Sequence, residues 1–214
     1  MSHLNLWKRQ LGVIPDEIWQ RHDLETLVLA DNGLTSISAE LGKLQRLRML
    51  DLGHNALTAV PDSLGKLSAL DFLYLHDNQL NELPGSLTRL QKLRYLNLSQ
   101  NDFTTLPAPV FEMKGLVELR LDDNQLTDLP VALGELGSLR ELHVRNNKLT
   151  TLPSAIAGLT SLRHLDLRGN PLQTLPAELG GLPALDKLDL RWTPTLEAPP
   201  WLADLEARGV LVYR

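Results

Sequence analysis

The sequence predicts an α/β fold, a solenoid of stacked units that each contribute one strand and one short helical segment. The first observation is a pattern, L-x-x-L-x-L-x-x-N-x-L-x-x-L-P-x-x-L-x-x-L-x-x, that recurs every 23 residues. Its first position is occupied by Leu24, Leu47, Leu70, Leu93, Leu116, Leu139, Leu162 and Leu185. A fixed period between roughly 20 and 50 residues indicates a solenoid or another repeat array. The second observation is that the spacing of the leucines changes inside each unit from two residues to three.

The third regular unit shows how the pattern makes each element. Leu73 and Leu75 alternate with Tyr74, so we expect a short strand with the leucines facing the core and Tyr74 facing outward. A proline then removes a backbone donor, which suits a sharp change of direction after a strand. Leu87 and Leu90 are three residues apart, so they face one way on a short helix or 3-10 turn.

A single unit cannot bury its own leucines, so the units must stack with their strands in parallel along one side. Because strands pack closer together than helices, we expect the strand side to be concave. The unbroken register predicts one domain over residues 1–214. Its expected parts are a capping repeat at 1–23, seven regular repeats over 24–184, and a degenerate repeat with a capping strand at 185–214.

The repeated L-P-x-x-L segment resembles the 23-residue subclass of leucine-rich repeat proteins, found among Ras-associated scaffold proteins and many bacterial proteins. The resemblance covers the whole chain. It implies a leucine-rich repeat solenoid, a right-handed horseshoe with a parallel concave β-sheet and short helical or 3-10 segments on the convex side. It also implies that one asparagine in each unit bonds backbone groups at the turn. These are Asn32, Asn55, Asn78, Asn101, Asn124, Asn147 and Asn170, and Arg9 and Thr193 replace them at the two ends.

The terminal units must close an otherwise open core, so we expect atypical, aromatic-rich ends. The tryptophans fit this expectation by position; they are Trp7, Trp19, Trp192 and Trp201. In the tail, residues 210–213 are predicted to add a tenth strand, with Leu211 and Tyr213 at its inward positions.

Composition limits the classes of function. The net charge of −5 comes from interspersed acids and bases, so the basic surface of a general nucleic-acid binder is absent. The chain has no cysteine, which excludes disulfides, thiolate metal sites and cysteine nucleophiles. No secretory signal and no run of about 20 apolar residues is present. We therefore expect a cytoplasmic protein that binds neither membrane nor nucleic acid, with a secreted effector as the alternative, and a bacterial source.

Specific function must lie on the variable positions beside the inward leucines, which line the concave face. Strands lie about 4.8 Å apart, so equivalent positions of successive units become lateral neighbours. One such group, which we call the aromatic patch, consists of Met49, Phe72, Tyr74, His76 and Tyr95. It uses three of the six Phe and Tyr residues in the chain. The rings would either shield the sheet by stacking or anchor a partner, and we favour the partner because tyrosine is enriched at binding hot spots.

A second group consists of basic residues at the same face. The arginine column comprises Arg145, Arg168 and Arg191, one in each of three successive units, with Arg120 a step away. Such a row could bind an acidic peptide or a phosphate group through bidentate contacts. Acidic residues lie among the arginines, however, and a surface charge lattice is the interpretation that we favour.

No metal, cofactor or catalytic site is expected. We considered one metal cluster on adjacent strands, comprising Asp51, His54, His76 and Asp77. Flat sheet surfaces seldom converge ligands well, and no supporting second layer of partners is visible in the sequence. The sequence contains no phosphate-binding glycine loop, nucleophile elbow or zinc-protease helix.

The predicted function is that of a monomeric, non-enzymatic recognition scaffold that binds a protein or peptide partner through its concave face. The alternative is the substrate-recruiting part of a bacterial effector or of a multidomain enzyme, a ligase or a kinase. Effector ligases with such repeats use a catalytic cysteine, so this chain would supply only the recruiting part.

Overall fold

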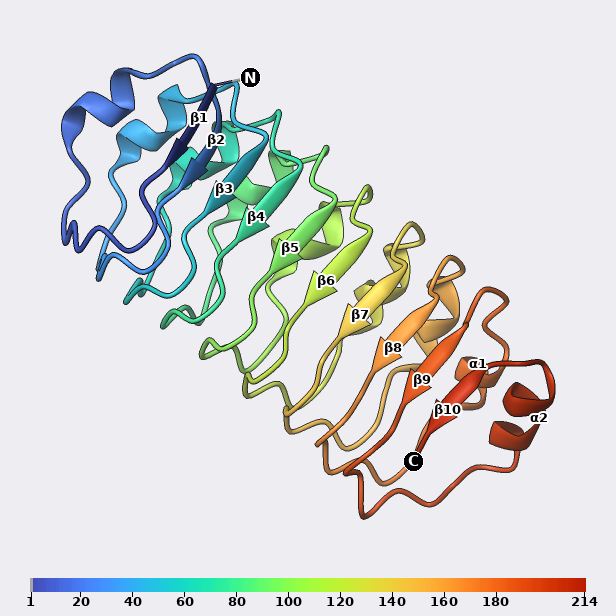
Figure 1. Ribbon diagram of the computed structural model, residues 1–214. Coiled ribbons are helices and arrows are strands. Elements are labelled where there is room, and N and C mark those ends of the chain that lie inside the picture. Colours follow the sequence, from blue (N-terminus) through green and yellow to red (C-terminus); the bar gives the residue numbers. More distant parts are fainter. Residues whose placement is uncertain (1) are drawn as a thin grey trace.

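A computed structural model describes residues 2–214, in which ten strands form one parallel sheet whose spatial order follows the sequence (Figure 1). The strands are β1 (Ser2–Asn5), β2 (Leu24–Val28), β3 (Met49–Asp51), β4 (Phe72–Tyr74), β5 (Tyr95–Asn97), β6 (Glu118–Arg120), β7 (Glu141–His143), β8 (His164–Asp166), β9 (Lys187–Asp189) and β10 (Leu211–Tyr213). The predicted α/β solenoid with a parallel sheet is therefore confirmed.

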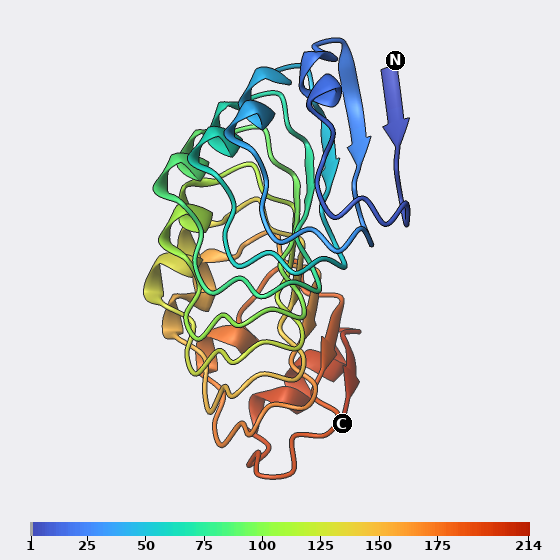
Figure 2. The same ribbon diagram turned by 90° about the vertical axis from the view of Figure 1, so that its left-hand side faces the viewer.

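Short helical segments form the second layer, and one of them follows each of the first nine strands. Seven are 3-10 helices: η1 (Asp16–Gln20), η2 (Ala39–Lys43), η3 (Asp62–Lys66), η4 (Gly85–Arg89), η5 (Ala108–Glu112), η6 (Val131–Glu135) and η7 (Ser154–Gly158). The other two are α1 (Ala177–Gly180) and α2 (Trp201–Ala207). Figure 2 shows these segments along the outer side of an arc and the sheet along its inner side. Within residues 2–214, the helices are too short or too polar to cross a membrane.

The core lies between the two layers and is built from the repeated leucines. In the third regular unit, Leu73, Leu75 and Leu87 are completely buried. Pro84 precedes η4 with an extended ψ of 143°, which turns the chain into the 3-10 segment. Each strand pairs only with its neighbours in sequence, so every unit is stabilised by the units on either side of it.

The asparagine ladder bonds the backbone at the turn after each strand. The side-chain amide of Asn124 donates to three carbonyl oxygens, those of Leu98, Leu121 and Asp122, at 2.9, 3.1 and 3.3 Å. Its side-chain oxygen accepts a hydrogen bond from the backbone N–H of Phe103 at 3.1 Å. Because these partners belong to two successive units, each asparagine links its own unit to the preceding one.

The residue just before each ladder asparagine has a left-handed backbone conformation. In the regular units and the unit after them, φ lies between 51° and 60° at Asp31, His54, Asp77, Gln100, Asp123, Asn146 and Trp192. Gly169 occupies the equivalent position with φ of +68°. The turn that positions the asparagine therefore requires a conformation that side chains other than glycine adopt only at a cost.

The inward positions predicted for the last strand were wrong by one residue. Leu211 pairs with Lys187 and Val212 with Leu188, so Val212 faces the core and Leu211 is 59% exposed. Tyr213, also predicted to face inward, is 40% exposed. The last unit contains α2 and is one residue longer than the others, and a shift of one residue turns a strand's side chains to opposite faces.

The tryptophans close the ends only in part. Trp19 in η1 is buried and Trp201 in α2 packs against the core, as expected for caps. Trp7 and Trp192 are 57% and 67% exposed. Trp7 occupies the seventh position of its unit, which faces the concave side. Trp192 occupies the left-handed turn position. Neither side chain therefore reaches the core.

Candidate functional site

The aromatic patch occupies the concave face of strands β3, β4 and β5. Met49, Phe72 and Tyr95 stand in register on these three strands, so their side chains form one row across the sheet. Tyr74 lies two residues after Phe72 on β4 and therefore emerges on the same face. The parallel pairing thus brings together residues that are up to 46 positions apart in the sequence.

The rings of the patch pack against one another and still face solvent. The centroids of Tyr74 and Tyr95 are 4.8 Å apart, and those of Phe72 and Tyr95 are 6.3 Å apart. His76 extends the group, with its ring 6.3 Å from that of Tyr74. Phe72 nevertheless remains 41% exposed. Mutual packing and an accessible apolar surface therefore coexist, and the two interpretations drawn from the sequence do not exclude each other.

A glycine makes room for the histidine at the edge of the patch. A Cβ atom at Gly53 would lie 2.3 Å from Cε1 of His76, so the imidazole can cover the backbone only because no side chain is there. His54 Nε2 lies 3.3 Å from His76 Nε2, and His54 Nδ1 lies 2.5 Å from a carboxylate oxygen of Asp77. The two histidines and Asp77 form a chain of pairwise contacts.

The patch is uncharged near neutral pH. Burial raises the pKa of Tyr95 to about 12 and also raises the pKa of Tyr74. Burial, together with the neighbouring His54, lowers the pKa of His76 below its ordinary value. Neutral aromatic groups lose less solvation free energy than charged groups when a partner covers them.

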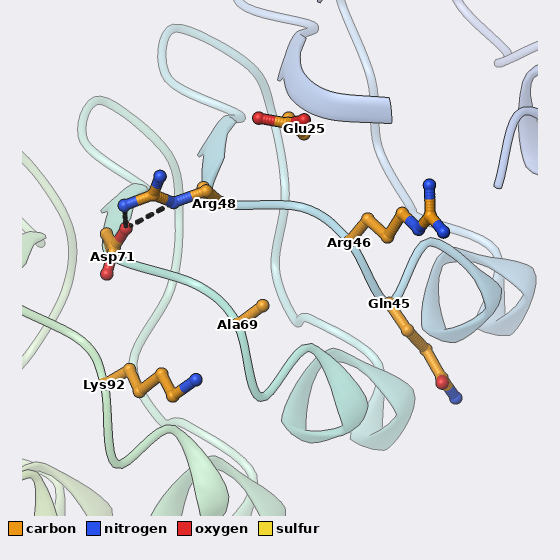
Figure 3. A pocket seen from close by; sticks show the side chains of 7 residues that line it. All are labelled: Glu25, Gln45, Arg46, Arg48, Ala69, Asp71 and Lys92. Carbon is orange, nitrogen blue, oxygen red and sulfur yellow. Dashed lines mark hydrogen bonds and ion pairs between the residues drawn. The ribbon is translucent and has the colours of Figure 1, made fainter. Parts of the chain in front are cut away.

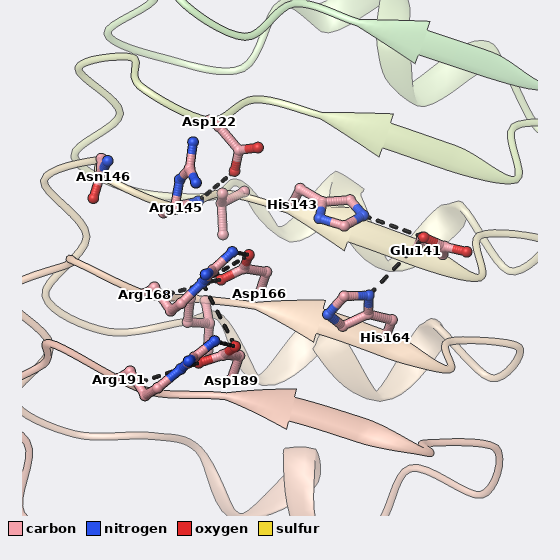
Figure 4. Close-up of polar contacts among 12 residues, drawn as sticks. Asp122, Glu141, His143, Arg145, Asn146, His164, Asp166, Arg168, Asp189 and Arg191 are labelled. Atoms are coloured by element: carbon pink, nitrogen blue, oxygen red, sulfur yellow. Dashed lines mark hydrogen bonds and ion pairs between the residues drawn. The ribbon is translucent and has the colours of Figure 1, made fainter. Parts of the chain in front are cut away.

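The arginine column is a paired charge lattice (Figure 4). The ion pairs join Arg145 to Asp123 at 3.0 Å, Arg168 to Asp166 at 2.5 Å and Arg191 to Asp189 at 2.7 Å. The structure therefore contains the pairing that the sequence favoured, and the use of these arginines by a partner stays a prediction.

Two of the acidic partners in this lattice are almost fully buried. Burial disfavours the charged form of Asp166, but hydrogen bonds from Arg168 outweigh this effect and hold its pKa below the ordinary value. The pKa of Asp189 is lowered in the same way, because hydrogen bonds from Arg191 outweigh its burial. A ligand that drew either arginine away would leave a buried carboxylate without its partner, which is costly.

Arg120 lies between the two groups on β6. Its Nε donates to a carboxylate oxygen of Glu118 at 2.6 Å, and Glu118 stands in register with Tyr95. Arg120 itself stands in register with Asn97 on β5, the last strand of the aromatic patch, and it too is paired with an acid.

A depression in the surface borders the aromatic patch, since Arg48 and Asp71, which line it, directly precede Met49 and Phe72 (Figure 3). It sits where the chain enters the first strands and is lined by Glu25, Gln45, Arg46, Arg48, Ala69, Asp71 and Lys92. Arg48 donates two hydrogen bonds to Asp71, at 2.8 and 2.5 Å. Figure 3 shows the side chains of Gln45, Arg46 and Lys92 spread apart, so they do not converge on one ligand position.

A cluster that sequence analysis did not single out lies on β7 and β8. One oxygen of Glu141 is 3.3 Å from Nε2 of His143 and 3.9 Å from Nδ1 of His164. The sequence signal was available, because Glu141 and His164 occupy the same position of successive units and His143 follows Glu141 by two residues.

The repeated pattern also matches a known family. Five overlapping matches to the family described as Leucine rich repeat cover residues 1–57, 21–80, 45–103, 114–172 and 138–194. Together they span well over half of the chain. The chain belongs to the leucine-rich repeat family. Among curated proteins, no match was found.

Solved leucine-rich repeat structures resemble this one over most of its length. A leucine-rich repeat protein of Leptospira interrogans is 29% identical with a TM-score of 0.77, and the match covers 95% of this chain and 64% of that chain. The ectodomain of the Arabidopsis thaliana membrane receptor kinase GASSHO1/SCHENGEN3, in complex with CASPARIAN STRIP INTEGRITY FACTOR 2, is 32% identical with a TM-score of 0.82. That match covers 100% of this chain and 26% of the ectodomain.

A third similar structure is the plant peptide hormone receptor RGFR1 in complex with RGF2. It is 26% identical with a TM-score of 0.64, and the match covers 84% of this chain and 34% of the receptor chain. This leucine-rich repeat chain therefore spans less than two thirds of the length of each of these three structures.

Proposed function

We propose that this leucine-rich repeat protein is a non-enzymatic recognition scaffold that binds a protein or peptide partner through its concave face. The observation that carries the proposal is the aromatic patch, in which Phe72 is 41% exposed while the neighbouring rings hold one another in place. Exposed groups of large apolar side chains mark interaction sites on protein surfaces.

Similar structures support recognition of peptides. The Arabidopsis receptor kinase ectodomain and RGFR1 were each solved in complex with another molecule, and RGFR1 is a plant peptide hormone receptor. Both share the parallel sheet of this chain. The inner face of such a sheet presents outward side chains of many units at once, so an extended partner could contact several units together.

The packing of the patch also favours affinity. Binding loses free energy when flexible side chains become ordered, by about 0.5–1.5 kcal/mol for each such side chain. Tyr74 and Tyr95 already contact each other at 4.8 Å, so little of this loss applies to them. Tyrosine also supplies a large contact area with few rotatable bonds. We therefore place the strongest contacts of the partner on Phe72 and Tyr95.

The test uses a partner captured from the native host by the wild-type chain and then purified. Its dissociation constant is measured against the wild type, Phe72→Ala and Tyr95→Ala by surface plasmon resonance. We expect each variant to bind about 10-fold or more weakly, since truncation of a hot-spot residue costs roughly 1–2 kcal/mol or more. Val131→Ala is the matched control, because Val131 is 74% exposed and lies on η6 on the opposite side.

The proposal fails if both variants bind the partner as tightly as the wild type while Val131→Ala does the same. Thermal unfolding of each variant shows whether the fold is retained. Phe72 and Tyr95 lie outside the core, so we expect the unfolding temperatures of their variants to stay within a few degrees of the wild type.

A second candidate function is recruitment of substrates for a larger protein, a bacterial effector or a multidomain ligase or kinase. The observation that favours it is the likeness to the leucine-rich repeat ectodomain of a membrane receptor kinase, in which such repeats belong to a larger enzyme. The reading frame in the source genome decides between the candidates, because a catalytic domain encoded with this chain would support recruitment.

We also propose that the protein is cytoplasmic and monomeric. Fractionation of host cells tests the location, and light scattering tests the oligomeric state.

A further inference from the structure

We propose that Glu141, His143 and His164 form a binding site for a divalent transition-metal ion of the zinc class. Glu141 and His143 are two residues apart on β7, so both side chains emerge on the concave face. His164 on β8 stands in register with Glu141. Two adjacent strands thus bring two imidazoles and one carboxylate to the same place on the sheet (Figure 4).

The distances fit a zinc-sized ion. One ligand atom from each of the three residues lies within 4.8 Å of the others. Zinc binds nitrogen and oxygen ligands at about 2.0–2.2 Å, so two ligands of a tetrahedral ion are about 3.3 Å apart. The separation of Glu141 and His143 is already 3.3 Å, and that of Glu141 and His164 is 3.9 Å. Rotations of the Glu141 and His164 side chains, which are 43% and 22% exposed, would bring the three ligand atoms to the separations that zinc requires.

The set of ligand atoms favours some metals over others. Two imidazoles and a carboxylate suit zinc and neighbouring first-row ions, whereas calcium and magnesium prefer sites made of oxygen atoms. Three protein ligands leave one position of a tetrahedral ion open. His143 is buried and Glu141 is partly exposed, so this position would face the concave surface rather than the core.

The two rings are held in place before any metal binds. Their centroids are 4.9 Å apart in an edge-to-face arrangement, and His143 is 7% exposed. Nδ1 of His164, 3.9 Å from Glu141, is the nitrogen that would bind the metal, and Nε2 of the same ring is buried without a hydrogen-bond partner within residues 2–214.

Charges near the cluster partly balance. Lys187 stands in register with His164 on β9 and opposes a bound cation. Asp166 stands in register with His143, and Figure 4 shows Asp122 on the other side of that ring. Asp166 is paired with Arg168, and Arg120 stands in register with His143 on β6, so the charges around the cluster largely cancel and metal binding would depend on the three ligand side chains themselves.

The test is calorimetric titration of the tag-free chain, stripped of metal with a chelator, with zinc chloride. We expect one saturable site per chain, with unchanged affinity when millimolar magnesium is present. His143→Ala and Glu141→Gln should each weaken zinc binding at least 10-fold. His54→Ala is the matched control, because His54 also contacts a histidine and a carboxylate on the concave face but lies outside the cluster.

Cobalt(II) in place of zinc gives a spectroscopic readout. A visible absorption band typical of a four- or five-coordinate ion should appear with the wild type and with His54→Ala, and should be lost in Glu141→Gln. The proposal is overturned if no saturable zinc binding occurs, or if zinc binds His143→Ala and Glu141→Gln as tightly as the wild type. Because no partner protein is needed, this test is independent of the proposed recognition function.

Discussion

At the scale of single residues, the buried asparagines show how a repeated side chain can be assigned a structural role. The sequence identified them because the same residue recurs at one position of every regular unit, and a buried amide must find hydrogen-bond partners. The structure supplies those partners, and the series ends where Thr193 replaces asparagine. Thr193 reproduces only part of the pattern, with its hydroxyl donating to Leu190 O at 2.6 Å.

Asn124→Ala should destabilise the chain strongly. The substitution leaves the N–H of Phe103 and the carbonyl of Leu98 without their side-chain partner in a buried place. Each unsatisfied buried group costs about 1–3 kcal/mol, so we expect a loss of about 2–4 kcal/mol in the free energy of unfolding, measured by urea denaturation. Gln125→Ala removes two exposed contacts, of 3.4 Å to Asp102 and 3.2 Å from Lys148, and should change it by about 0.5 kcal/mol or less. Equal losses of stability in the two variants would contradict the structural role assigned to the buried asparagines.

Stability should fall as the pH is lowered below about 6.5. His76 and His164 both have pKa values below the ordinary 6.5, so between the lowered values and 6.5 the unfolded chain binds more protons than the folded chain. The free energy of unfolding then decreases with falling pH in this range. Urea midpoints measured at several pH values, with chelator present, should show a shallower decrease in the double variant His76→Gln, His164→Gln. Identical slopes in the two proteins would refute this contribution.

Side-chain contacts were harder to predict than side-chain positions. The positions of Glu141, His143 and His164 in the unit place them on adjacent strands of the concave face, but these positions do not specify the rotamers that bring their ligand atoms within 4.8 Å of one another. The same holds for the arginine column, where interspersed acids were visible but the particular partners were not. Rotamers depend on local packing, which a repeat pattern does not specify.

At the scale of elements, every regular unit follows the same path, so the sequence predicted most of the strands and turns. Leu87 in η4 and its equivalents were recognised from their three-residue spacing, and the expected 3-10 turn is present. The left-handed turn was not predicted, because its position carries Asp, His, Gln, Asn, Gly and Trp in different units. The ladder hydrogen bonds impose this conformation, and many side chains tolerate it at modest cost. The residue type at this position therefore does not reveal the conformation.

Gly169→Ala should destabilise the chain by about 1–2 kcal/mol. Its φ of +68° disfavours any Cβ atom, and the added atom would lie 2.2 Å from Oδ1 of Asn146. Gly85→Ala is the matched control, because a Cβ there meets nothing within 4 Å and its φ lies outside the left-handed region. It should leave stability unchanged or raise it slightly. Thermal unfolding measures both, and a larger loss for Gly85→Ala would contradict the assigned backbone conformations.

The last strand is the element that the sequence placed wrongly. Continuing the 23-residue period put Leu211 inward, but the degenerate final unit is longer by one residue, and no leucine pattern marked the change. Val212→Ala should therefore lower the free energy of unfolding by about 1 kcal/mol, because Val212 packs against the core. Leu211→Ala should change it much less, since Leu211 is 59% exposed. If Leu211→Ala destabilises the chain more than Val212→Ala in chemical denaturation, the pairing register of the last strand described above is contradicted.

At the scale of the whole molecule, stacking converts a linear pattern into a curved sheet with one accessible inner face (Figure 2). The sequence predicted this architecture because each unit must bury its leucines against its neighbours. It also predicted which positions face inward along the arc. It did not identify a partner, since the residues on those positions follow no family-wide pattern. We propose the aromatic patch as the part of the concave face that recognises the partner, because it combines packed rings with an exposed Phe72.

Hydroxyl-radical footprinting with the captured partner tests that claim most directly, because it reports side-chain exposure in the unmodified chain. We predict that labelling of Phe72 and Tyr95 falls at least several-fold in the complex, while labelling of Val131, which is 74% exposed and lies on η6 on the opposite side, stays unchanged. Unchanged labelling of Phe72 and Tyr95 in a saturated complex, with protection elsewhere on the chain, would contradict recognition through the aromatic patch.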